Sequence, residues 1–313
     1  MTPPLPDPKH MAVRYWLQAT RPRTLPLALA STLCGGLLAA QQGKLHIITL
    51  VLSILTAALL QIFSNLANDY GDAVHGADNR LRQGPERMVA GGKISRTAMQ
   101  KALLACAISC CLSGILLLSA ARPDIRYTLW LLLGASAVLA AFTYTAGIKP
   151  YGYHGFGEAA VLLFFGWLGV IGSEYLHTGR LNMLSFLPAT ALGLWCCMVL
   201  NLNNMRDIDS DTCAGKRTLA VRLGTARAKL YHTALLLIAA LCWSIWLPLA
   251  YTAGKQAVLQ TVLLVFSTAH LFFLKKASSP LLLNRMLPQW SFTVLTWVAL
   301  LWLAADIPAD YIR

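Results

Sequence analysis

The chain has 313 residues, of which 57% are hydrophobic and only 12% are charged. Soluble domains carry about a quarter charged residues, so these ionic groups are too few to cover a water-soluble surface. The composition therefore excludes a soluble enzyme and predicts an integral membrane protein. The formal net charge of +13 is explained by loop topology and by attraction to anionic lipid, so we expect no nucleic-acid partner.

The first 23 residues are rich in Pro and aromatic residues, unlike a cleaved signal peptide, so we expect residues 1–23 to remain as a cytoplasmic segment. Apolar runs fill residues 24–305, each close to the roughly 20 residues that cross a bilayer. The nine runs are 24–41, 46–66, 101–121, 127–146, 158–177, 183–203, 230–250, 257–274 and 289–305. The sequence thus predicts an all-α domain of nine transmembrane helices, followed by a short tail, residues 306–313.

Lys and Arg are distributed unevenly over the connections between these runs. When the connections are assigned alternately to the two sides, 20 of the 26 basic residues share the side of the N-terminus and six lie on the other. Basic residues favour the cytoplasmic side of a membrane. We therefore predict a multi-pass protein of the cell inner membrane with a cytoplasmic N-terminus.

Acidic residues follow a different rule, because six of the 13 fall in two short stretches where a helix reaches the cytoplasm. The second apolar run is followed by Asp69, Asp72 and Asp78, and the sixth by Asp207, Asp209 and Asp211. A carboxylate near hydrocarbon is costly without a partner, so the clustering marks a functional site. NLAND and NLNNMRD also echo each other, which suggests a weak four-helix repeat. The two motifs are then able to face one another across a central cavity near the cytoplasmic face.

Helical spacing suggests what these carboxylates bind. Asp69 and Asp72 are spaced i, i+3, and Asp207 and Asp211 are spaced i, i+4, so each pair shares a helix face, whereas Asp209 points elsewhere. Converging carboxylates repel one another unless a cation lies between them, and Mg²⁺ prefers oxygen ligands. We therefore predict that these two pairs bind Mg²⁺.

Basic residues stand beside both acidic motifs. GPERMVAGGKIS carries Arg87 and Lys93, and GKRTLAV carries Lys216 and Arg217. Acids and bases together predict a diphosphate that is bridged to Mg²⁺ while Lys and Arg neutralise its remaining oxygens. In the alternative interpretation, the acids pair only with arginines close in sequence. Those arginines are Arg80, Arg82 and Arg206.

NDYGDAVHGAD and NNMRDIDSDTCAGKRTLAV resemble the two Asp-rich motifs of the UbiA superfamily of intramembrane prenyltransferases. RPRTLPLALA (21–30), R-x-G-P-x-R (82–87) and YTAGIKPYGYHGFGE (144–158) are similar to the branch that acts on 1,4-dihydroxy-2-naphthoate. The resemblance implies transfer of a polyprenyl group from polyprenyl diphosphate to 1,4-dihydroxy-2-naphthoate. Carbon dioxide is lost and demethylmenaquinone, a precursor of menaquinone, is formed.

The resemblance also implies roles for individual residues. Catalytic roles are implied for Asn68, Asp69, Asp72, Lys149, Asp207 and Asp211, of which the four aspartates would hold Mg²⁺. Substrate binding is implied for Arg21, Asn65, Arg87, Tyr144, Glu158, Asn204, Lys216 and Arg217. The choice among Arg21, Arg23 and Glu158 for orienting or deprotonating the acceptor stays open. Gly76 stands where the wider superfamily has a third acid, and the role of Asp78 is also open.

Three other functions remain as alternatives. A 4-hydroxybenzoate polyprenyltransferase of ubiquinone biosynthesis would use the same fold and metal site, and farnesylation of haem is a more distant alternative. From a different class, an ion-coupled transporter also carries intramembrane acids and weak repeats. Transporter carboxylates usually lie near the membrane midplane on interrupted helices, whereas these stand at helix ends.

Overall fold

The computed structural model describes residues 8–78, 80–121 and 126–307, and within these ranges all regular structure is helical. The predicted all-α class is confirmed. The α-helices are α1 Pro8–Thr20, α2 Leu25–Gln41, α3 Ile47–Val74, α4 Arg96–Ala120, α5 Tyr127–Thr143, α6 Gly157–Val161, α7 Ser173–Thr178, α8 Phe186–Arg206, α9 Ile208–Cys213, α10 Leu219–Ala250, α11 Ala253–Lys276 and α12 Pro280–Ala304. A π-helical segment, Leu162–Gly172, joins α6 to α7. Short 3₁₀ turns occur at Pro22–Thr24, Tyr151–His154 and Met183–Ser185.

All nine apolar runs lie on these helical segments. In the described part of the chain, eight helices are long and apolar enough to cross a membrane. The remaining run corresponds to α5, which has only 17 residues, so a ninth crossing stays a prediction. α3 continues beyond residue 66 as far as Val74. Asp69 and Asp72 therefore stand on the helix itself.

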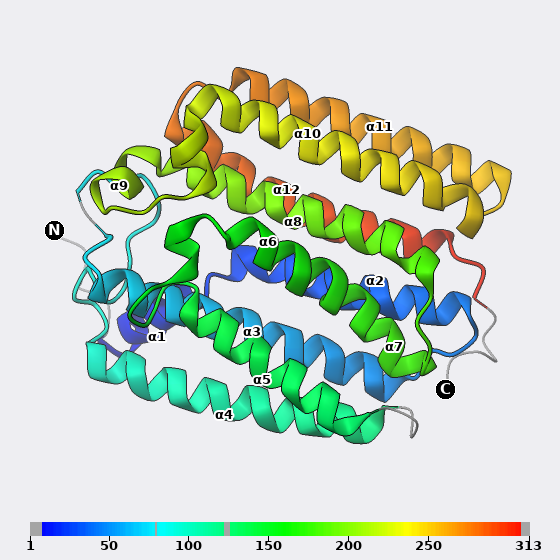
Figure 1. Ribbon diagram of the computed structural model, residues 1–313, viewed down its shortest axis with the longest axis horizontal. Coiled ribbons are helices and arrows are strands. Elements are labelled where there is room, and N and C mark those ends of the chain that lie inside the picture. Colours follow the sequence, from blue (N-terminus) through cyan, green and yellow to red (C-terminus); the bar gives the residue numbers. More distant parts are fainter. Residues whose placement is uncertain (1–7, 79, 122–125, 308–313) are drawn as a thin grey trace, which may run out of the picture.

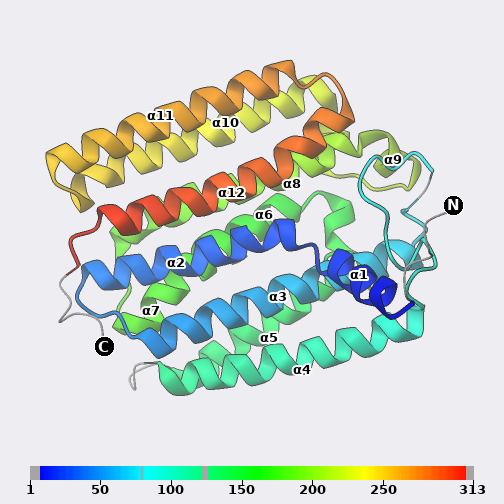
Figure 2. The same cartoon turned by 180° about the vertical axis from the view of Figure 1, so that it is seen from behind.

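The long helices run side by side and stack in layers (Figure 1). α10 and α11 form one side of the bundle, α8 and α12 lie next to them, and α3, α4 and α5 form the opposite side. Seen from behind, α2 lies between α12 and α3 (Figure 2). α1, α9 and the connection between α3 and α4 gather at one end of the bundle. The segments that carry the acidic motifs are thus brought to a common end.

The two sides of the bundle are packed differently. Between α8, α10 and α12, the rings of Trp195, Trp243 and Trp297 pack against one another with centroids 5.5 to 5.9 Å apart. Such aromatic clusters bury a large apolar area in a fixed geometry. On the opposite side, α5 has no fully buried residue and its main contacts are with α3 and α4. The dense side forms the larger part of the core, and the other side leaves room for a cavity.

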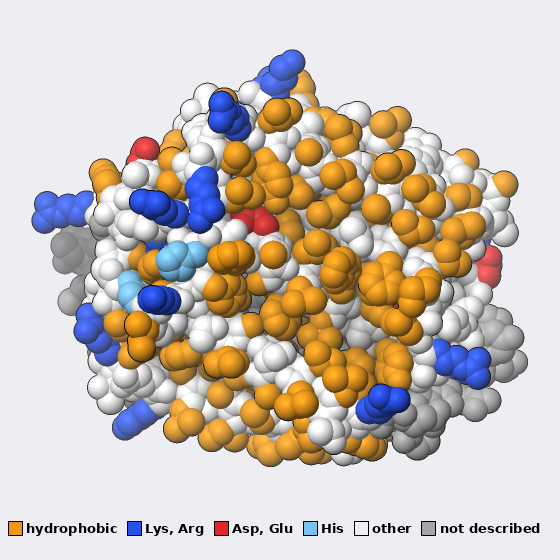
Figure 3. All heavy atoms as spheres, viewed as in Figure 1, with side chains coloured by type: hydrophobic (Ala, Val, Ile, Leu, Met, Phe, Trp, Pro, Cys, Tyr) orange, Lys and Arg blue, Asp and Glu red, His pale blue; other side chains and the backbone are white. Residues whose placement is uncertain are grey.

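The outer surface has an apolar band. Hydrophobic side chains cover the middle of the face in Figure 3, whereas Lys and Arg gather toward the end that carries α1 and α9. Leu104 of α4 and Leu132 of α5 are each 65% exposed. A contiguous apolar belt of this kind marks contact with lipid rather than with water. The structure is that of a multi-pass membrane protein.

A close approach between the π-helical segment and α8 supports the core. A methyl group on Gly166 would lie 2.7 Å from the Ala189 carbonyl oxygen and 3.0 Å from Gly193 Cα. We expect Gly166→Ala to destabilise the fold by about 1–3 kcal/mol through overpacking, which lowers the midpoint of thermal unfolding in detergent.

The control for this substitution is Gly254→Ala in α11, where no atom lies within 4 Å of the added methyl group. Both substitutions replace a helical glycine with alanine, which favours helix, so a lower midpoint for Gly166→Ala alone reports the packing against α8. Equal midpoints for the two variants would contradict the close approach.

Candidate active site

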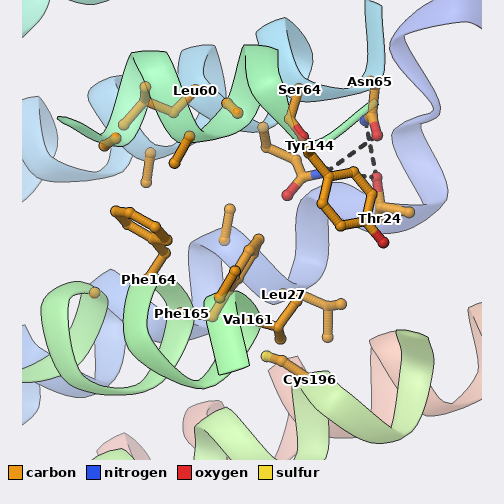
Figure 4. Close-up of a pocket in the computed structure, with 18 of the residues that line it drawn as sticks. Thr24, Leu27, Leu60, Ser64, Asn65, Tyr144, Val161, Phe164, Phe165 and Cys196 are labelled. Carbon is orange, nitrogen blue, oxygen red and sulfur yellow. Dashed lines mark hydrogen bonds between the residues drawn. The ribbon is translucent and has the colours of Figure 1, made fainter. Parts of the chain in front are cut away.

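A cavity of about 630 Å³ lies on the loosely packed side of the bundle, with walls from α2, α3, α4, α5, α8 and the π-helical segment. Pockets of this size hold organic ligands. Apolar Leu60, Phe164 and Phe165 face one part of it, whereas polar Asn65 and Tyr144 gather at another (Figure 4). The cavity therefore has an apolar body and a polar end.

The polar end is built where α3 and α8 reach the same end of the bundle. Asn68 and Asp72 of α3 line it together with Asn204 of α8, and Asp207 and Asp211 line it at the turn into α9. The sequence motifs predicted to face one cavity do so. The i, i+4 argument for the second motif needs adjustment, because α8 ends at Arg206 and Asp207 caps it with non-helical angles.

Asp72 is the most heavily contacted of these acids and is only 2% exposed. Its Oδ2 lies 2.5 Å from Arg87 Nη2, and its Oδ1 lies 2.7 Å from Lys216 Nζ. The Tyr153 hydroxyl donates a hydrogen bond of 2.8 Å to Oδ1. Burial, reinforced by the Asp72 charge, raises the pKa of Tyr153 above its ordinary value, so the phenol stays a donor.

Lys216 connects the two acidic motifs. Its Nζ atom also lies 3.8 Å from Asp211 Oδ1 and 4.5 Å above the centre of the Tyr153 ring. Burial raises the pKa of Asp211 to about 6, and the Lys216 charge opposes that rise. The ammonium group marks the point between two carboxylates where positive charge is most stable.

Asp207 and Asp78 bear out part of the alternative interpretation, in which acids pair with nearby arginines. Arg206 donates to both Asp207 oxygens, at 2.9 Å from Nε and 2.5 Å from Nη2. Arg82 Nη1 lies 3.0 Å from Asp78 Oδ1. These arginines pair with carboxylates that are largely buried, so the site mixes pairing within the protein with groups that face the cavity.

Asp69 differs from its prediction. It is 2% exposed, it is not part of the cavity wall, and its two oxygens accept hydrogen bonds from the backbone N–H groups of Met88 and Val89. The spacing of Asp69 and Asp72 placed both in the site. The structure separates them because the chain after α3 folds back over Asp69.

Three further predicted residues lie off the cavity wall. Lys149 and Arg217 are exposed, and their predicted contacts with a diphosphate stay predictions. Glu158 is buried behind the wall, where Asn204 Nδ2 lies 3.4 Å from its Oε1. The other predicted substrate-binding residues do line the cavity. They are Arg21, Asn65, Arg87, Tyr144, Asn204 and Lys216.

Sequence reasoning did not assign Tyr153 to the site and considered Arg82 only as a partner for the acids, but both residues line the cavity. Tyr153 belongs to the YGYHGFGE stretch, which was used above only for the family resemblance. That membership was the one sign in the sequence that Tyr153 belongs to the site. The Tyr151–His154 turn is tied to the Lys216 segment by a 2.8 Å hydrogen bond from Arg217 N–H to the Tyr153 carbonyl. That link brings Tyr153 and Lys216 to the same carboxylate.

Guanidinium groups with some unpaired N–H donors surround the polar end. Arg21 Nη2, Arg82 Nε and Arg87 Nη1 are buried without a hydrogen-bond partner. Arg21 is also the one non-glycine residue with a positive φ, 47°, among those described. Buried donors are normally satisfied, and strained backbone clusters at functional sites. Together these groups suit a ligand with several anionic oxygens.

The oxygen donors fit a hard divalent cation. Asp72 and Asp211 face the point that Lys216 now occupies, and the amides of Asn68 and Asn204 lie on the same wall. In the described ranges no three His, Cys, Asp or Glu side chains are grouped to hold a metal ion by themselves. Mg²⁺ often takes only one or two carboxylates and completes its shell with water and phosphate oxygens, so this donor set suits it.

Comparison with known proteins identifies the family, because residues 28–292 match the UbiA prenyltransferase family. The chain belongs to this family. A 1,4-dihydroxy-2-naphthoate octaprenyltransferase of Escherichia coli K12 is 47% identical over 232 residues, 74% of this chain and 75% of the relative. One from Mycobacterium tuberculosis is 39% identical over 229 residues, 72% of this chain and 75% of the relative.

Solved UbiA structures share the fold. A UbiA homologue from Archaeoglobus fulgidus bound to GPP and Mg²⁺ superposes with a TM-score of 0.62 at 15% identity, covering 92% of this chain and 99% of the other. The apo structure of a homologue from Aeropyrum pernix gives a TM-score of 0.62 at 16% identity, with 93% and 98% covered. At these identities the likeness supports the architecture alone.

Asp78 gives the site a pH dependence. Burial, followed by the charge of Asp72, raises the pKa of Asp78 from its ordinary 3.8 to about 7. At a pH between these two pKa values, Asp78 keeps its proton in the folded protein and has lost it in the unfolded chain. The stabilisation from this proton is full below the unfolded pKa and is lost as the pH rises through the folded pKa.

We therefore expect Asp78→Asn, which stays neutral, to gain stability relative to the parent protein as the pH rises from about 4 to about 7. The measurement is the midpoint of thermal unfolding of both proteins in detergent across this range. A difference in midpoint that is constant with pH would contradict the raised pKa.

Proposed function

We propose that this protein transfers a polyprenyl group from polyprenyl diphosphate to 1,4-dihydroxy-2-naphthoate, in a Mg²⁺-dependent reaction that releases CO₂ and forms demethylmenaquinone. The observation that carries the proposal is the meeting of Asp72, Asp211 and Lys216 at the polar end of an otherwise apolar cavity. The acceptor is supported by the relatives in E. coli and M. tuberculosis, which carry that activity in their names.

The polar end binds the diphosphate. Lys216 and Arg87 would move from Asp72 to phosphate oxygens, and the carboxylates of Asp72 and Asp211 would hold Mg²⁺ together with Asn68 and the nearby Asp207. Bound there, Mg²⁺ supplies positive charge that stabilises the departing diphosphate. The guanidinium and ammonium groups add to the same effect, because they are fixed where negative charge develops.

The apolar body protects the reactive prenyl group. When the C1–O bond breaks, the electron pair leaves with the diphosphate and the allylic carbon becomes a cation that water would destroy. Leu27, Leu60, Val161, Phe164 and Phe165 line this region (Figure 4), and apolar walls exclude water. The rest of the prenyl tail extends away from the polar end and passes sideways into lipid.

The acceptor ring lies between the cation and the arginines. The ring carbon that bears the carboxylate forms the new bond to C1, the bond to the carboxyl group then breaks, and its electron pair restores the aromatic ring as CO₂ departs. Arg21 has an unpaired buried N–H on this wall and binds an oxygen of the acceptor. Glu158 acts behind the wall by orienting Asn204.

The membrane arrangement completes the proposal. The chain crosses the cell inner membrane nine times, with α5 as the short crossing, and the end that carries α1 and α9 faces the cytoplasm. The Lys and Arg side chains that gather at this end support the orientation (Figure 3). Polyprenyl diphosphate then enters with its tail in lipid and its head at the cytoplasmic surface.

The alternatives are weaker for different reasons. Membership of a prenyltransferase family argues against an ion-coupled transporter. The 4-hydroxybenzoate acceptor keeps the same metal and diphosphate chemistry, but the relatives with 39% to 47% identity carry the naphthoate in their names.

An acceptor competition tests the proposal. Purified protein in lipid, with Mg²⁺ and a long-chain prenyl diphosphate, is given each acceptor in turn, and prenylated product and CO₂ are measured. We expect decarboxylative prenylation of the naphthoate and a rate with 4-hydroxybenzoate at least about tenfold lower. A prenylated hydroxybenzoate that keeps its carboxyl group as the main product would overturn the acceptor.

The orientation is tested separately by cysteine labelling. In a variant without native cysteines, single cysteines at exposed Arg217 and Lys149 should react with an impermeant reagent only when the cytoplasmic face is open. A cysteine at Lys44, in the connection between α2 and α3, should react from outside. Labelling of all three positions from the same side would contradict the arrangement.

A further inference from the structure

The segment between α3 and α4 that carries Arg87, residues 84–95, is here called the Arg87 loop. Its middle is a compact turn, in which the Met88 carbonyl accepts hydrogen bonds of 2.9 Å from the N–H groups of both Lys93 and Ile94. Gly92 has a φ of 68°, which favours glycine. The turn is therefore a defined structure, and its position depends on the contacts that attach it to the bundle.

Asp69 supplies a polar anchor. Its Oδ2 accepts a hydrogen bond of 3.0 Å from Met88 N–H, and its Oδ1 accepts one of 2.9 Å from Val89 N–H. Each carboxylate oxygen thus takes one peptide donor of the loop. Hydrogen bonds to an ionised acceptor are about twice as strong as neutral ones. The pair also satisfies a carboxylate that is 2% exposed.

Apolar packing reinforces the same attachment. Met88 is 2% exposed and Val89 8% exposed, and both belong to a cluster with Phe63 and Leu66 of α3. The backbone of residues 88 and 89 is therefore fixed on both its polar and its apolar side. Arg87 is the next residue toward the N-terminus, so its Cα position is fixed with them.

Asp69 and Asp72, on one turn of α3, bind different parts of the Arg87 loop. Asp69 binds the backbone just after Arg87, whereas Asp72 Oδ2 lies 2.5 Å from the Arg87 guanidinium. Only Asp72 belongs to the cavity wall. One acid therefore holds the loop in place, and the other faces the ligand.

We propose that Asp69 is a positioning residue that fastens the Arg87 loop to α3 and so presents Arg87 to the diphosphate, and that it does not bind Mg²⁺. The inference rests on the proposed function only in the identity of the ligand that Arg87 meets. The attachment itself is a property of the protein without substrate. Loss of Asp69 weakens diphosphate binding through Arg87 and leaves the metal ligands intact.

The test uses Asp69→Asn, with Asp209→Asn as the matched control, because Asp209 is an exposed aspartate of α9 and the charge change is the same. The asparagine keeps one acceptor oxygen but turns an NH₂ group toward a backbone donor. In substrate-free protein, we expect hydrogen exchange of the amides of Met88 and Val89 to be slow in the parent and in the control. In Asp69→Asn it accelerates by at least about tenfold, as one lost charge-assisted bond predicts.

Binding of geranyl diphosphate supplies the second readout. At saturating Mg²⁺, we expect Asp69→Asn to raise the dissociation constant of geranyl diphosphate about tenfold. At saturating geranyl diphosphate, the Mg²⁺ concentration that gives half-maximal binding should stay at the parent value. Asp72→Asn should raise that Mg²⁺ concentration. If Asp69→Asn raises it equally, Asp69 is a metal ligand and the proposal is wrong.

A double mutant distinguishes an effect of Asp69→Asn through Arg87 from a general loss of folding. If Asp69 acts through Arg87, adding Asp69→Asn to Arg87→Gln weakens geranyl diphosphate binding no further. If the increases in the dissociation constant from the two single substitutions multiply in the double mutant, the proposal is overturned. Fast exchange of Met88 and Val89 in the parent protein would also overturn it without any variant. Because exchange needs no substrate, failure of the prenyl-transfer proposal is distinguishable from failure of this one.

Discussion

A buried negative charge at the end of a membrane helix is the constraint on which the rest of this site depends. Asp72 is 2% exposed, so its carboxylate must be neutralised within the protein. Arg87 comes from the segment between α3 and α4, Tyr153 from the one between α5 and α6, and Lys216 from the one between α9 and α10. One carboxylate therefore ties three remote segments to α3.

The same constraint prepares the site for its substrates. The bases that neutralise Asp72 are the groups suited to diphosphate, and the carboxylates they cover are the groups suited to Mg²⁺. Without ligand, the acids pair with these bases, and several buried arginine N–H groups keep no partner. In the proposed reaction, metal and diphosphate arriving together would give these charges new partners, whereas either ligand alone would leave an unpaired charge at a costly depth. The proposal therefore implies that the two ligands bind jointly.

The unequal packing of the bundle matches the two needs of the reaction. The Trp195, Trp243 and Trp297 cluster gives α8 a rigid support, and α8 leads directly to Asp207 and α9. The facing helix α5 has no fully buried residue, and its inner side borders the cavity. A rigid wall holds charged groups in position, and a loosely packed wall admits a long apolar tail.

The sequence by itself determined the membrane class, the helical segments and the two acidic motifs, because apolar length and charge clustering are local properties of the chain. It also predicted that Asp72, Asp211 and Lys216 belong together. Only the tertiary structure decided that Asp69 binds the backbone of Met88 and Val89 rather than the cavity. Helical spacing gives a side chain's direction, but its partner depends on which remote segment packs there. For the same reason Tyr153 was missed, and Lys149 lies off the cavity wall that it was expected to join: the places of both residues depend on how the α5 to α6 connection folds over the end of the bundle.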